Sequence, residues 1–90
     1  MTFMSIKPTL PDKGTLSKLL TETWDVHSEF QENYLNGERD EMWAGWYAGY
    51  LLGRLGNFTT PTVLTRLLME TETHKPWADQ AAEHLIKSLG

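Results

Sequence analysis

Imidazole, guanidinium and aromatic side chains occur in this chain at spacings that would bring them together on helices. One face of residues 43–55 carries large rings and ends at Arg54, and His27 lies in the middle of an earlier apolar face. An imidazole titrates near neutral pH and can move a proton, while a guanidinium can pair with a carboxylate or stack on a ring. We therefore predict one candidate ligand site, suited to a flat or anionic ligand. Its residues are His27, Trp46, Tyr47, Tyr50 and Arg54.

The same residues also have a structural interpretation. An aromatic stripe at helical spacing is more often part of a core than of a cofactor site, and His27 fits a hydrogen-bonded core histidine. Buried tyrosine hydroxyls and tryptophan N–H groups need partners, which His27 and Arg54 can supply. The sequence alone leaves open whether the aromatic stripe is core, pocket or interface.

Three glycines, Gly45, Gly49 and Gly53, form a row at four-residue spacing within the same segment. Each glycine inside a helix costs about 1 kcal/mol relative to alanine, so the row needs a compensating contact. The first interpretation is close packing against the helix at 15–34, the helix at 77–89 or the N-terminal arm. A homodimer contact is the second, which makes the row a candidate interface, and the flat face of a ligand is the third.

The elements that would position these groups are four helices, and no strand pattern occurs. Apolar residues recur at helical spacing over 15–34, 40–55, 61–73 and 77–89. We expect Thr15, Asp40 and Thr60 to cap the first three helices, with Pro61 favouring the start of the third. The inward face of the first helix is predicted to hold Leu16, Leu19, Leu20, Thr23, Trp24, His27, Phe30 and Tyr34.

The chain also repeats itself. LSKLLTET at 16–23 matches LTRLLMET at 64–71, and WAGWYAGYLLGRLG at 43–56 matches WADQAAEHLIKSLG at 77–90. One amphipathic hairpin cannot cover its own apolar face, but two can cover each other. We predict an all-α, four-helix bundle-like domain over 14–90, built from two related hairpins (15–56 and 60–89), after a flexible arm at 1–13.

The segment DEMWAGWYAGY at 40–50 resembles the motif D-x-x-W-x-x-W-Y-A-x-Y of a family of small bacterial helical proteins without a known function. The resemblance implies a small helical domain and carries over no catalytic residue. The second hairpin departs from the family pattern, because Gln80, Ala81 and His84 stand where aromatic residues are usual.

Composition narrows the function classes. The 90 residues carry a net charge of −4, and seven acids face a single base, Arg39, between residues 22 and 41, which argues against nucleic-acid binding. There is no cysteine, and the three histidines are dispersed, so we expect no metal and no cofactor. No apolar run approaches the roughly 20 residues of a membrane helix, and the start lacks a signal-peptide pattern, which favours a cytoplasmic bacterial protein.

We therefore expect a non-enzymatic interaction or binding module, with a homodimer as one form of it. The alternative is a small-molecule-binding protein or minor enzyme that uses the predicted pocket between the first two helices. A third hypothesis is a regulator whose acidic first helix meets a basic partner protein. The ligand, the partner and the pathway do not follow from the sequence.

Overall fold

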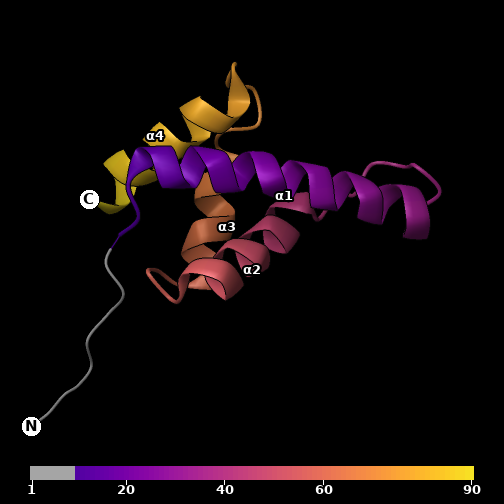
Figure 1. The fold of residues 1–90 in the computed structure, drawn as a ribbon, viewed down its shortest axis with the longest axis horizontal. Helices are drawn as coiled ribbons and strands as arrows, with labels where there is room; N and C mark the ends of the chain where they lie inside the picture. The colour runs from indigo at the N-terminus through magenta and orange to yellow at the C-terminus, as the bar shows by residue number, and fades with distance from the viewer. Residues whose placement is uncertain (1–9) are drawn as a thin grey trace, which may run out of the picture.

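The computed structural model describes residues 10–90, which form four helices and, within that range, no strand (Figure 1). The helices are α1 (Lys13–Tyr34), α2 (Trp43–Leu55), α3 (Pro61–Met69) and α4 (Trp77–Leu89). The predicted all-α class is confirmed. The arm predicted at 1–13 falls largely outside the described residues. None of the helices in the described part combines the length and apolarity needed to cross a lipid bilayer.

The helices pack in two matching pairs. α1 packs most extensively against α4, and α2 most extensively against α3. Figure 1 shows α1 running across the molecule, with α4 on one side and α2 and α3 on the other. The sequence repeat relates α1 to α3 and α2 to α4, so it also relates these two contacts to each other. Each hairpin therefore covers the apolar face of the other, as the repeat predicts.

The core is built from equivalent positions of the two hairpins. Burial of one leucine side chain contributes about 1.5–3 kcal/mol, so these matched positions supply much of the stability of a small domain. The fully buried equivalent pairs are Leu16 with Leu64, Leu20 with Leu68, Leu51 with Leu85, and Thr23 with Thr71.

The start of α1 differs from the prediction. Asp12, not Thr15, is the N-cap, and its carboxylate accepts a hydrogen bond from the Thr15 amide at 2.8 Å. An aspartate is at least as good a capping residue as threonine, and it adds a negative charge at the positive end of the helix. At α3 the predicted cap is correct, since the Thr60 hydroxyl accepts from the Val63 amide at 3.2 Å.

Two further helix limits are corrected. Asp40 caps a turn rather than α2 itself: its carboxylate accepts from the Met42 amide at 2.9 Å, and α2 begins at Trp43. α3 ends at Met69 instead of near residue 73. Beyond that end the buried Thr71 hydroxyl donates to the Leu68 carbonyl at 2.6 Å, which stabilises a turn in place of continued helix.

Part of the predicted inward face of α1 lies at the surface. Trp24 is 55% exposed and Tyr34 is 75% exposed. α1 has 22 residues whereas α2 and α4 have 13 each, so its C-terminal part extends past the helices that could cover it (Figure 1). The position of Trp24 matters for the site described next.

Candidate functional site

The five residues of the predicted site lie along the seam between α1 and α2. The His27 ring lies 4.8 Å from the Trp46 ring and 5.2 Å from the Tyr47 ring. Trp46 stacks on Tyr50 at 5.7 Å with an interplanar angle of 9°, and the Arg54 guanidinium lies 5.7 Å from the centre of the Tyr50 ring. The structure thus brings the five together, but as a line of packed side chains.

The polar end of this line is satisfied within the protein. The Tyr50 hydroxyl donates to the Glu22 carboxylate at 2.6 Å, and Arg54 pairs with the same carboxylate and donates to the Tyr50 hydroxyl at 3.1 Å. Arg54 and Glu22 are both about half exposed, so their ion pair is worth no more than about 1 kcal/mol. We expect Arg54→Ala to lower the free energy of unfolding by that amount or less in urea denaturation, and to leave ligand binding elsewhere unchanged.

His27 is buried and bonded to a carboxylate. Its Nε2 lies 2.8 Å from Oδ2 of Asp40. Burial raises the pKa of Asp40, but the hydrogen bonds from His27 and the Met42 amide, with the attraction of His27, outweigh it and hold that pKa below its ordinary value. The Asp40 amide also donates to the Gln31 side chain at 2.9 Å. These bonds fix the loop before α2 against α1.

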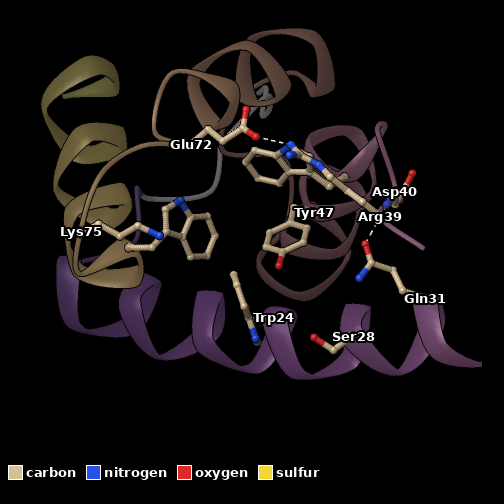
Figure 2. Close-up of a pocket in the computed structure, with 10 residues that line it drawn as sticks. Trp24, Ser28, Gln31, Arg39, Asp40, Tyr47, Glu72 and Lys75 are labelled. Carbon is tan, nitrogen blue, oxygen red and sulfur yellow. Dashed lines mark hydrogen bonds and ion pairs between the residues drawn. The ribbon is translucent and has the colours of Figure 1, made fainter. Parts of the chain in front are cut away.

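A cavity of about 290 Å³ lies beside Tyr47, and Figure 2 shows the side chains around it. Its walls come from α1, the loop before α2, α2, the turn after α3 and the first residue of α4. Tyr47 is the only one of the five predicted site residues that lines it. The cavity is therefore formed largely by residues that the sequence reasoning did not single out.

Four aromatic rings form the apolar part of the cavity: Trp24, Trp43, Tyr47 and Trp77. The planes of Trp43, Tyr47 and Trp77 meet pairwise at 77°, 78° and 86°, with ring centres 5.2–6.1 Å apart. Trp24 lies 6.1 Å from Trp77 and is tilted by 48° to it. The indole N–H of Trp77 donates to the Thr71 hydroxyl at 2.9 Å, which fixes this ring in place.

The hydroxyl of Tyr47 is the notable polar group of the cavity. Tyr47 is only 4% exposed, and its hydroxyl has no hydrogen-bond partner among residues 10–90. Every fully buried side-chain nitrogen or oxygen in that range does have a partner, so the Tyr47 hydroxyl must be reached from the cavity. Figure 2 shows it pointing between Trp24 and Ser28. Burial, with a smaller contribution from Asp25, raises the pKa of Tyr47 to about 12, so the hydroxyl stays protonated.

Four charged residues line the cavity: Arg39, Asp40, Glu72 and Lys75. Arg39 pairs with Glu72, which joins the loop before α2 to the turn after α3, and its guanidinium also lies 3.8 Å from Glu41. Asp40 is bonded to His27. Within the described part of the chain, Lys75 forms no ion pair.

The glycine row of α2 lies on the outside of the molecule. Gly45, Gly49 and Gly53 are exposed, and a Cβ atom placed on any of them would meet nothing within 4 Å among residues 10–90. The predicted close packing of this row against α1 or α4 is therefore wrong, because residues of α1 and α4 contact α2 on its other faces. The predicted contact with the N-terminal arm involves residues outside the described range.

The remaining observations bear on what kind of site this is. Among residues 10–90, no group of three or more histidine, aspartate or glutamate side chains is placed to hold a metal ion. Comparison of the chain with protein-family models, with curated proteins and with solved structures finds no match. The resemblance carried by the motif at 40–50 stays a prediction.

Proposed function

We propose that this protein is a non-enzymatic binding module whose ligand occupies the cavity beside Tyr47. The observation that carries the proposal is the hydroxyl of the largely buried Tyr47 side chain, which is neutral, has no hydrogen-bond partner among residues 10–90 and is open to the cavity. Because this hydroxyl is reached from the cavity, it is free to form a hydrogen bond with a ligand that enters there.

The size and lining of the cavity support a ligand over a packing defect. The cavity is partly open to solvent, and its volume of about 290 Å³ accommodates a small organic molecule or a single long side chain. Apolar walls with a few convergent polar groups are typical of ligand sites. Trp24, which is 55% exposed, would gain burial when the cavity is filled.

The lining supports binding more than catalysis. His27, the residue we first considered as a proton carrier, faces Asp40 and is not among the residues that line the cavity. The cavity instead presents aromatic rings, the hydroxyls of Tyr47 and Ser28, the Gln31 side chain and charged groups. These groups bind and orient a ligand, and none of them is paired with a nucleophile.

The proposal is tested by two-dimensional NMR of the protein with a fragment library that contains cationic, neutral and anionic compounds. We expect at least one class to shift the indole N–H signals of the cavity tryptophans. Trp24→Ala should remove these shifts. Tyr34→Ala is the matched control, since it removes an exposed ring of the same helix that does not line the cavity. Library hits that map elsewhere, or no hit in any class, would overturn the proposal.

We also propose a cytoplasmic location and a bacterial source, which the absence of cysteine from the sequence supports. Self-association through Gly45, Gly49 and Gly53 stays a prediction of their spacing. The open space beside them leaves room for a second helix.

A further inference from the structure

We infer that the cavity takes an organic cation, namely an ammonium or guanidinium group carried by a small molecule or by a side chain. This inference rests on the proposed function, because it names the chemical class of the ligand in the same cavity. It departs from the flat or anionic ligand that the sequence favours. Three features of the cavity support it: its aromatic rings, the acidic residues around its α1 wall and the pairing of Arg39, one of its two basic residues, with Glu72.

Four aromatic rings line the cavity and can attract a cation. The face of an aromatic ring carries negative charge density and attracts a cation within about 6 Å of its centre, tryptophan most strongly. Trp43, Tyr47 and Trp77 stand edge to face and line the same cavity, so a cation in it would lie close to more than one ring. Trp24 adds a fourth ring, and three of the four are tryptophans. A compact cation gains from several faces at once, whereas a flat ligand can stack on only one or two of them.

The α1 wall of the cavity lies in a field of negative charge. Ser28 lines the cavity, and its neighbours at i−3 and i+4 on the same helix are the exposed acids Asp25 and Glu32. The effect of Asp25 reaches the cavity, because it contributes to the raised pKa of Tyr47. The ionised Asp40 adds a further carboxylate in the lining itself.

Of the two basic residues of the lining, one is paired with a carboxylate within the protein and the other opposes this field. Arg39 pairs with Glu72 and lies near Glu41, so its charge is compensated twice within the protein. Lys75 is the one base of the lining without an ion pair among residues 10–90, and its side chain is exposed to solvent. Its charge would disfavour a cation, and this makes Lys75 the most informative residue to change.

The polar groups suit an N–H donor. The Tyr47 hydroxyl oxygen has free lone pairs, and the Gln31 carbonyl oxygen, which already accepts from the Asp40 amide, can accept a second hydrogen bond. Figure 2 shows the Tyr47 hydroxyl directed toward α1, the helix that carries Gln31 and Ser28. A primary ammonium or guanidinium group would donate to these oxygens while its carbon chain lies against the rings.

The test compares probes of equal shape and different charge. Choline and 3,3-dimethyl-1-butanol differ only by the replacement of the charged nitrogen with carbon, and 3,3-dimethylbutanoate supplies an anion of similar shape. Dissociation constants are measured by tryptophan fluorescence and NMR titration at low salt. We expect choline to bind about 5- to 30-fold more tightly than the alcohol and the carboxylate to bind most weakly.

Two variants make the charge assignment decisive. Lys75→Gln should tighten choline binding about 2- to 5-fold, because it removes a like charge from the lining, and Lys87→Gln on the exposed face of α4 is the matched control. If the cavity binds anions instead, Lys75→Gln should weaken the binding of the carboxylate. Tighter binding of the alcohol or the carboxylate than of choline would overturn the inference and leave the proposed binding function standing. Failure of all probes and of the fragment library would overturn both.

The source of the cation is read from two further probes. Nα-acetyl-lysine amide and Nα-acetyl-arginine amide present the side chains that a protein partner would insert. Because choline has no N–H group, n-butylammonium is the small-molecule reference for this comparison, and tighter binding of either amide than of n-butylammonium supports a partner's side chain as the occupant. The reverse order supports a free small cation.

Discussion

Replacement of Gly49 with alanine should stabilise this protein, although glycines at regular spacing usually mark positions that tolerate no side chain. Gly49 lies in the middle of α2, and an added Cβ would meet nothing within 4 Å among the described residues. Alanine is favoured over glycine inside a helix by about 1 kcal/mol. Gly45 and Gly53 lie within the first and last turns of α2, where the gain is smaller, so the triple replacement should add about 2 kcal/mol.

The assay is urea denaturation followed by circular dichroism, with thermal unfolding as a second readout. For a domain of this size, 1 kcal/mol corresponds to a rise of about 4–8 °C in the melting temperature. Gly56→Ala is the matched control within the same helix region. Gly56 has a φ of 87°, where an alanine side chain is strained, so this variant should lose about 1–2 kcal/mol.

Light scattering over a concentration series, for wild type and Gly49→Leu, shows whether a second chain uses this face. A monomer in both cases, with Gly49→Ala stabilised, agrees with glycines that face only water. A dimeric wild type and a folded, monomeric Gly49→Leu would refute that reasoning and confirm the interface predicted from the spacing. Destabilisation of Gly49→Ala in a monomeric protein would refute it as well.

Two further predictions concern hydrogen bonds that hold the cavity in shape. Thr71→Val should lower the free energy of unfolding, measured by urea denaturation, by about 1–2 kcal/mol, because it removes the partner of the Trp77 indole N–H. The equivalent variant Thr23→Val removes only a bond to a helical carbonyl and should cost less. Equal losses in the two variants would contradict this prediction. Asp40→Asn should lose about 1–3 kcal/mol near neutral pH, because the charged partner of His27 is removed. Because folding lowers the pKa of Asp40, the stabilisation by its carboxylate is present above pH 4 and is lost as the pH falls through the pKa of Asp40 in the folded protein. The free energies of unfolding of wild type and variant should therefore converge in acid. A constant difference between them down to pH 2 would contradict this prediction.

The helices and their packing could be predicted because local patterns determine them. Thr60 with Pro61 marks the start of α3, Gly56 marks the end of α2, and the spacing of leucines identifies the faces that become buried. The internal repeat added the arrangement of the two hairpins. The starts of α1 and α2 were predicted wrongly, with Thr15 and Asp40 as caps. These starts depend on which of several nearby side chains reaches a free backbone amide.

The cavity could not be predicted, because helical periodicity says nothing about how the loops and the turn that form part of it are placed in space. Arg39, Glu72 and Lys75 come from loops, and their convergence depends on how the hairpins pack. One signal was available: Trp43 and Trp77 occupy equivalent positions of the repeat, and both line the cavity. By contrast, Arg54 was grouped with the site by helical spacing alone, and it pairs with Glu22 at the opposite end of the seam.

The most direct test of the central claim, that the cavity beside Tyr47 binds an organic cation, is an isotope-filtered NMR experiment on the protein with choline. It detects protein protons within about 5 Å of the choline methyl groups. Our account predicts contacts with the rings of Trp24, Tyr47 and Trp77, which the Trp24→Ala variant should lose. No contacts at saturating choline would contradict it, as would contacts confined to exposed apolar side chains outside the cavity, which are Val26, Tyr34, Met42 and Met69.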